Sequence, residues 1–142
     1  ISVRLVGSEM CIRDRHNPLH IGYLSDLGGN RLEVEVWNGN GKKTNMHRVW
    51  DGLIPNYALT KPLLFLDIEK ASPIEIGMSH EERVIYWINE NREILLSDAV
   101  GYVARQSFLD QAYFEKNVPI AYYRMSFAGS RLAYLIEELL GN

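Results

Sequence analysis

The sequence predicts a mainly α-helical protein with one small inserted β-hairpin. Helices are indicated by apolar residues at helical spacing over residues 118–140 and by a capping-box pattern from Ser79 to Glu82. The hairpin is indicated by alternating polar and apolar residues over 31–37, followed by the turn sequence of residues 38–41.

The composition fits one globular domain with a normal core. The chain has 142 residues and a formal net charge of -3, so no overall basic field attracts nucleic acid. This charge does not exclude a nuclease, because bound metal ions can supply positive charge locally. No apolar run is long enough to cross a bilayer, and no signal peptide is visible.

The first half of the chain is predicted to alternate turns and short elements. Pro18 lacks an amide hydrogen and disfavours helix at Asn17, which indicates a helix start or a break. A glycine turn is predicted over residues 26–30, and a helix is predicted to begin within 44–51. Prolines divide residues 55–78 into what we expect to be short helices joined by loops.

The second half is predicted to be helical. The helix that opens at Ser79 places four apolar residues near one face, and residues 108–115 are also predicted to be helical. Residues 118–140 form the longest predicted helix, with Gly141 at its end. Its expected packing positions are Tyr122, Met125, Phe127, Leu132, Leu135, Ile136 and Leu139.

Two imidazoles and one carboxylate form a candidate zinc site. His47 and Asp51 are four residues apart and would share one face of a helix. The turn and hairpin that precede them can return the chain to His20, which supplies a third ligand. A single His–Asp pair is usually a surface ion pair, so the prediction depends on the three residues together.

Residues 1–15 do not read as natural protein sequence. Residues 5–14 match the translation of a widely used transposase sequencing adapter, one frame of which encodes L-V-G-S-E-M-C-I-R-D. We therefore interpret residues 1–15 as adapter-derived, and we expect the natural chain to be truncated at its N-terminal side. Cys11 lies in this stretch, so cysteine usage indicates no redox compartment.

Three ordered segments resemble the zinc-dependent single-strand nuclease and 3′-nucleotidase family of the nuclease S-one/P-one type. Residues 14–20, 28–30 and 45–51 follow the family patterns D-x-x-Q-P-L-H, G-G-N and N-L-H-x-x-W-D, and residues 128–133 resemble its closing A-G-x-R-L-A helix. Asn17 and Met46 replace the usual Gln and Leu. The resemblance implies that residues 16–142 are the C-terminal part of one zinc nuclease domain with the phospholipase C-like helical fold.

The resemblance also implies roles for individual residues. His20, His47 and Asp51 would bind one zinc ion of a three-zinc cluster, and the other ligands would lie upstream. Asp14 stands at the position of the catalytic aspartate that bridges the other two zinc ions, although its codon falls in the adapter-like stretch.

Two further residues are candidates for contact with substrate. Leu27 matches a position where the family places an apolar wall against the nucleobase, and plain loop packing is its alternative interpretation. Asn30 could touch phosphate or hydrogen-bond the backbone, and the backbone is the favoured interpretation.

The activity implied is cleavage of single-stranded DNA or RNA to 5′-phosphorylated products, together with dephosphorylation of 3′-nucleotides. Family members are secreted or periplasmic, and neither a membrane nor an obligate protein partner is implied. Two alternatives stay open. One is a zinc phospholipase C-type phosphodiesterase with the same fold, and the other is a non-catalytic fragment that binds one zinc ion.

Overall fold

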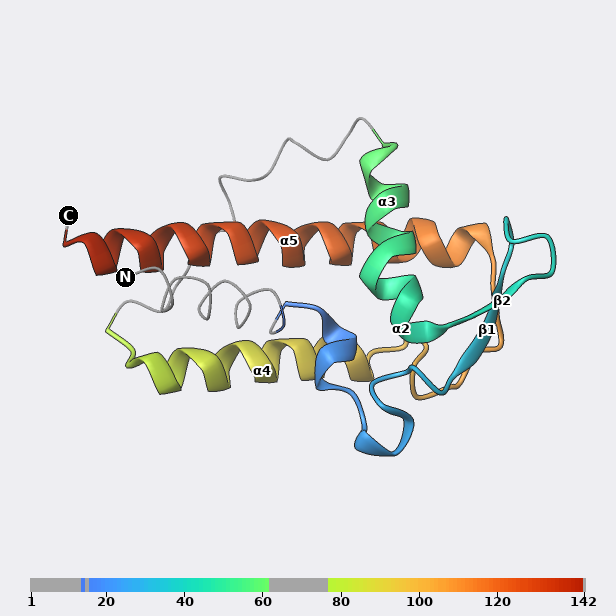
Figure 1. The fold of residues 1–142 in the computed structure, drawn as a ribbon, viewed down its shortest axis with the longest axis horizontal. Coiled ribbons are helices and arrows are strands. Elements are labelled where there is room, and N and C mark those ends of the chain that lie inside the picture. Colours follow the sequence, from blue (N-terminus) through green and yellow to red (C-terminus); the bar gives the residue numbers. More distant parts are fainter. Residues whose placement is uncertain (1–13, 15, 62–76, 142) are drawn as a thin grey trace.

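Two long helices lie side by side and form the body of the molecule (Figure 1). The computed structural model describes residue 14, residues 16–61 and residues 77–141. Helix α4, His80–Leu96, runs antiparallel to helix α5, Gln111–Leu140, and a small sheet lies at one end of the pair. The mainly α-helical prediction is confirmed. Within the described residues, no helix has both the length and the apolar character needed to span a membrane.

Short elements fill the first half of the chain and lead into the helix α3, which crosses α5 (Figure 1). In chain order they are η1 Pro18–Ile21, η2 Leu24–Asp26, β1 Glu33–Val36, β2 Lys43–Asn45, α2 Met46–Arg48, the π-helical turn η3 Val49–Leu53 and α3 Ile54–Leu59. Of residues 55–78, which were expected to form short helices, 62–76 lie outside the described residues.

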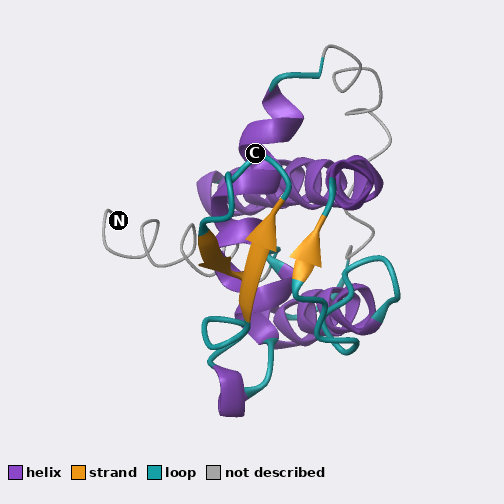
Figure 2. Ribbon diagram, turned by 90° about the vertical axis from the view of Figure 1, so that its right-hand side faces the viewer, coloured by secondary structure: helices purple, strands orange, loops and turns teal. Residues whose placement is uncertain are grey.

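The predicted hairpin is confirmed, and a third strand joins it. Val34 of β1 lies opposite Thr44 of β2 in an antiparallel pair, and β3, Phe108–Leu109, pairs in parallel with the other edge of β1. Figure 2 views the long helices nearly end-on, with the strands in front of them. The prediction of helix at residues 108–109 is therefore wrong, because pairing with β1 outweighs local preference there.

The helix that was predicted within residues 44–51 begins at Met46 instead of at residue 44. Thr44 and Asn45 belong to β2, and the side chain of Asn45 accepts a hydrogen bond from the backbone amide of Arg48 (2.8 Å). Asn45 is therefore the N-cap of α2, where its amide oxygen satisfies an otherwise unpaired donor of the first turn. This cap places His47 and Asp51 on the helical path that follows.

The core lies where the sheet, α3 and the first half of α5 meet. The indole of Trp50 donates to the hydroxyl of Tyr113 (3.0 Å), which in turn donates to the carbonyl of Val100 (2.7 Å). Burial raises the pKa of Tyr113, so this hydroxyl stays protonated. The largest fully buried apolar side chains of this core are Tyr102, Leu19, Met46, Ile54, Leu95, Leu109, Val34, Val49 and Val100.

The helix signals near the C-terminus are mostly confirmed. Ser79 and Glu82 form the capping box, and Gly141 has a φ of 74°, which suits the left-handed end of α5. Helix α5 continues from residue 111 to 140 through Pro119, so the two helices expected there are one. The packing expectation was wrong for Met125 and Leu139, which are 41% and 60% exposed.

Buried arginines join α4 to α5. Glu90 accepts from Arg131 at 2.8 and 3.0 Å and from Arg124 at 3.0 Å, and both arginines are almost fully buried. Burial by itself raises the pKa of Glu90, but the hydrogen bonds and charges of the two arginines outweigh burial and hold it below its ordinary value. The carboxylate is therefore stabilised in its charged form.

We predict that Glu90→Gln lowers the free energy of unfolding by about 3 kcal/mol at neutral pH, because it removes the carboxylate that two buried guanidinium groups share. The stabilisation by Glu90 should be complete above its unfolded pKa, near 4.5, and should be lost as the pH falls through the folded value. Urea unfolding of the chain and of the variant at several pH values measures this.

The matched control is Glu93→Gln, which changes an exposed glutamate on the same helix. It should cost less than about 0.5 kcal/mol. Equal losses in the two variants would show that the α4–α5 ion pairs do not stabilise the fold.

Candidate metal centre

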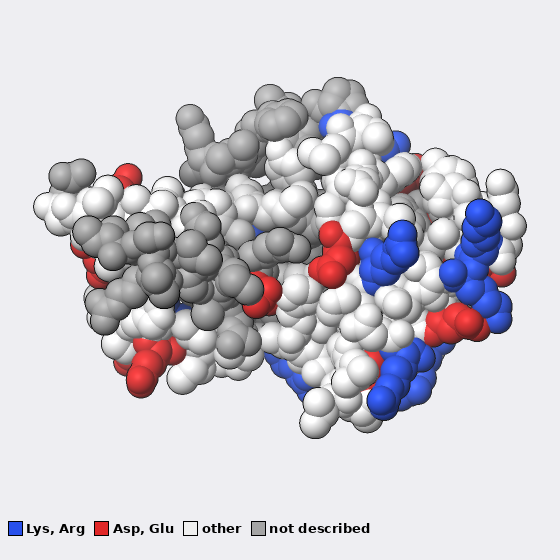
Figure 3. Space-filling view, viewed as in Figure 1, with Lys and Arg blue, Asp and Glu red and all other residues white. Residues whose placement is uncertain are grey.

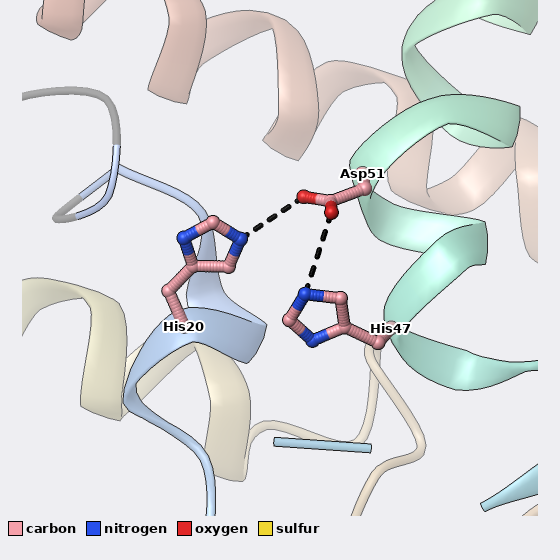
Figure 4. A group of neighbouring side chains, drawn as sticks. All are labelled: His20, His47 and Asp51. Atoms are coloured by element: carbon pink, nitrogen blue, oxygen red, sulfur yellow. Dashed lines mark hydrogen bonds and ion pairs between the residues drawn. The ribbon is translucent and has the colours of Figure 1, made fainter. Parts of the chain in front are cut away.

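His20, His47 and Asp51 meet at one point, as the sequence predicted, with the carboxylate of Asp51 between the two imidazoles (Figure 4). His20 Nε2 lies 3.0 Å from Asp51 Oδ1, and His47 Nε2 lies 3.3 Å from Asp51 Oδ2. One potential ligand atom from each residue falls within 4.8 Å of the others. The imidazole rings are stacked, with centroids 5.0 Å apart and planes only 3° from parallel.

His20 is positioned by the short helix η1. Asn17 caps this helix by accepting from the amide of Leu19 (3.0 Å), and Pro18 occupies its first turn, where the missing amide hydrogen costs nothing. The side-chain amide of Asn17 also donates to Asp51 Oδ1 (2.6 Å). Asn17 therefore connects the segment that carries His20 to the carboxylate from η3.

His47 is oriented by a backbone carbonyl. Its Nδ1 lies 2.8 Å from the carbonyl oxygen of Gly28, and a carbonyl can only accept, so Nδ1 carries the hydrogen. A Cβ on Gly28, at φ +61°, would lie 2.3 Å from the carbonyl oxygen of Leu19. The predicted glycine turn is confirmed, and its lack of a side chain lets this carbonyl reach the imidazole.

The resulting donor set suits a divalent metal ion. With the hydrogen held on Nδ1, the neutral form of His47 directs the lone pair of Nε2 at the carboxylate of Asp51, and two acceptors in contact require a cation or a proton between them. Two imidazole nitrogens and a carboxylate oxygen are a three-ligand set that zinc accepts in sites with an open position. The contact between Gly28 and His47 is the outer hydrogen bond that typically orients a metal-binding imidazole.

Asp14 lies beside this group without belonging to it. Its Oδ1 is 3.4 Å from Nδ1 of His20, on the opposite side of the ring from Asp51, and its side chain is about half exposed. His20 is therefore flanked by two carboxylates.

A buried pair that the sequence interpretation missed supports the glycine turn. Asp26 is 5% exposed and accepts from the amide of Gly29 (3.0 Å) and from the hydroxyl of Tyr102 (2.5 Å). The Tyr102 hydroxyl also accepts from the amide of Tyr23 (3.1 Å). Burial and the hydrogen bond to Asp26 raise the pKa of Tyr102 to about 12, so it remains a donor. An aspartate three residues before a glycine was a visible turn signal.

Two pockets of about 430 Å³ each open beside the three residues. The first contains Asn17, His20 and Asp51 and is otherwise largely apolar, with Trp50 and small side chains of α5 in its wall. The second contains His20 and His47 and also has Asp14 in its lining.

The two candidate substrate residues differ in whether they line a pocket. Leu27 is 48% exposed and lines the second pocket beside His20 and His47, where an apolar wall was expected. Asn30 is not among the residues that line either pocket, and its amide nitrogen donates to the carbonyl of Leu27 (2.9 Å). The favoured backbone interpretation of Asn30 therefore agrees with the structure, and Asn30 supports the loop that carries Leu27.

Comparison with known proteins finds nucleases, both in the family model and in the curated relatives. The family model described as S1/P1 nuclease matches residues 10–141. Endonuclease 5 of Arabidopsis thaliana is 52% identical over 144 residues, covering 89% of this chain and 47% of its own length. Endonuclease 1 of the same plant is 30% identical over 148 residues, covering 91% and 47% respectively. The chain thus spans about half the length of the curated relatives it matches.

We predict that Gly28→Ala destabilises the chain by about 2 kcal/mol or more, because alanine is strained at positive φ and its Cβ would collide with the Leu19 carbonyl. The collision should also displace the Gly28 carbonyl, so the fraction of His47 protonated at Nδ1 should fall. Urea unfolding measures the first effect, and nitrogen NMR shifts of the imidazole measure the second.

Gly52→Ala is the matched control, because a Cβ on Gly52 meets nothing within 4 Å and its φ is not positive. It should leave the imidazole shifts of His47 unchanged and should not destabilise the chain. An unchanged His47 tautomer in Gly28→Ala would contradict the orienting role of the turn.

Proposed function

Because the chain belongs to the S1/P1 nuclease family, we propose that it is part of a zinc-dependent phosphodiesterase. The whole protein would hydrolyse single-stranded DNA or RNA to 5′-phosphorylated products and would also remove phosphate from 3′-nucleotides. The observation that carries the proposal is the convergence of His20, His47 and Asp51, each of which offers one potential ligand atom within 4.8 Å of the others.

These three residues would hold one zinc ion of three in the whole protein. Zinc, when bound, lowers the pKa of a bound water and neutralises charge that develops on phosphate. The Gly28 carbonyl keeps Nε2 of His47 free to bind, and the Asn17 amide holds Asp51 toward the imidazoles. Asp14 would contribute to the neighbouring part of the cluster, since it already lies against His20.

The second pocket is the proposed place for the nucleotide. Leu27 supplies an exposed apolar surface next to the two imidazoles, and an unpaired base can leave its strand to pack against such a surface. A base held in a duplex cannot do so, which accounts for a preference for single strands. Asn30 would act indirectly, by holding the backbone of Leu27 in its left-handed conformation.

The proposal extends to the cellular location and to the chain by itself. The whole protein would be secreted or periplasmic, like the family generally. The 142-residue chain would bind one zinc ion and hydrolyse little, because its described residues bring together ligands for only one metal site.

We predict that zinc binds the chain weakly at one site and that His47→Ala abolishes this binding, because one of three ligands is lost. Isothermal titration calorimetry with zinc measures both results. The control is His80→Ala, which removes an exposed imidazole on α4 and should leave the zinc isotherm unchanged. Tight binding, or an equal loss in both variants, would contradict the assignment.

We further predict that the full-length gene product cleaves single-stranded DNA in a zinc-dependent manner and that the 142-residue chain does so weakly. A gel assay with single-stranded DNA, run beside an assay of phosphatidylcholine hydrolysis, tests the substrate class. Hydrolysis of the lipid alone would favour the phospholipase C-type alternative. Strong cleavage by the short chain, abolished by His47→Ala, would refute its proposed inactivity.

A further inference from the structure

Three exposed basic residues lie between the glycine turn and the end of α2. Arg31, Lys42 and Arg48 are all exposed, and none of them makes an ion pair within the described part of the chain. We call these three residues the basic surface. Arg31 donates one hydrogen bond to the carbonyl of Ser25 (3.0 Å), which leaves its charge without a counter-charge.

Two backbone hydrogen bonds join the segment that carries Arg31 to the segment that carries His47 and Arg48. The amide of Met46 donates to the carbonyl of Leu32 (3.0 Å), and the amide of His47 donates to that of Gly29 (3.4 Å). Arg31 and Arg48 are each next to one of these bonded residues in the chain, so they flank the segment that carries His47. The hairpin that continues from there carries Lys42.

The hairpin region and helix α4 carry an excess of opposite charge. Residues 31–48 hold four basic and two acidic residues, whereas α4 holds two basic and four acidic residues. The buried guanidinium groups of the helix pair all face glutamates, as in the pairs of Arg83 with Glu138 and of Arg131 with Glu90. Figure 3 shows Lys and Arg gathered over the half of the molecule with the hairpin and α2.

We propose that the basic surface binds phosphates of a single-stranded polynucleotide beyond the nucleotide that occupies the metal centre. Exposed, unpaired cations gain from phosphate contact, because binding releases counterions from the nucleic acid. Ion-paired arginines, such as those of the helix pair, would first have to give up their glutamates. The local positive field attracts the strand although the chain as a whole is negative. This inference rests on the proposed function, since it assigns the path of that substrate.

The test compares Arg31→Gln/Arg48→Gln with the control Lys61→Gln/Lys116→Gln, which removes one positive charge just after α3 and one from α5. A third variant, Arg31→Lys/Arg48→Lys, keeps the charge. Binding of a fluorescein-labelled oligodeoxythymidine is followed by anisotropy over a range of salt concentrations in EDTA, so that the metal centre does not contribute. Circular dichroism shows whether each variant is folded.

In the first variant, the slope of log affinity against log salt should shrink by about 1.4, which is about 0.7 for each lost phosphate contact, and affinity should fall roughly 10-fold at low salt. The control and the lysine variant should retain the slope of the unmodified chain. Binding of thymidine 3′-phosphate in the presence of zinc should be equal in all variants, because none of the three basic residues lines either pocket beside the metal centre.

Several results would overturn the inference. One is that the unmodified chain does not bind the oligonucleotide. Another is that Arg31→Gln/Arg48→Gln and the control lose equal affinity for it. A third is that the chain binds phosphatidylserine vesicles but not the oligonucleotide. The proposed function fails separately, if zinc promotes neither binding nor hydrolysis of thymidine 3′-phosphate. In that case, a loss of oligonucleotide binding confined to Arg31→Gln/Arg48→Gln would still support the basic surface.

Discussion

The close approach of the glycine turn to its neighbours is the constraint on which the candidate centre depends. A Cβ on Gly28 would meet the Leu19 carbonyl at 2.3 Å, and one on Gly29 would meet the Leu19 side chain at 2.8 Å. Only a backbone without side chains fits between η1 and α2, and its carbonyl then orients His47. His20 directly follows Leu19, so the same packing sets how far apart the two imidazoles lie.

The elements on each side of this turn are attached to different long helices. On one side, η1 packs against α4, where a guanidinium nitrogen of Arg92 donates to the Ile21 carbonyl (3.1 Å). On the other side, α3 packs against α5, and Trp50 of η3 is bonded to Tyr113. The proposed ligands are therefore carried by short segments whose relative position depends on the α4–α5 pair, so a loss of helix packing would also separate the ligands.

The arginines of the chain serve two different purposes in this arrangement. Those between α4 and α5 are buried and paired with glutamates, and these ion pairs join the two long helices. Those near the hairpin are exposed and keep their charge available. The net charge of -3 conceals this division, because it sums 15 basic and 18 acidic residues regardless of where they lie. Binding of an anionic polymer depends on the local field, to which exposed arginines contribute more than buried, ion-paired ones.

Short-range patterns in the sequence predicted both much of the fold and the three central residues. The capping box at Ser79 and the glycine turn depend on hydrogen bonds between residues close in the chain. Both partners of such bonds are therefore visible in one short stretch of sequence. The spacing of His47 and Asp51 is equally local. His20 was placed with them because the turn and hairpin return the chain to its starting point.

The tertiary structure decided what depends on distant partners. Residues 108–109 became a strand because they pair with β1, which lies far earlier in the chain. The bond between Asp26 and Tyr102 joins residues 76 positions apart, so no local pattern could reveal which group satisfies that buried carboxylate. The sequence by itself determined which residues are the candidate metal ligands. Only the folded chain decided which nitrogen of His47 faces Asp51, because a carbonyl 19 residues away holds the other.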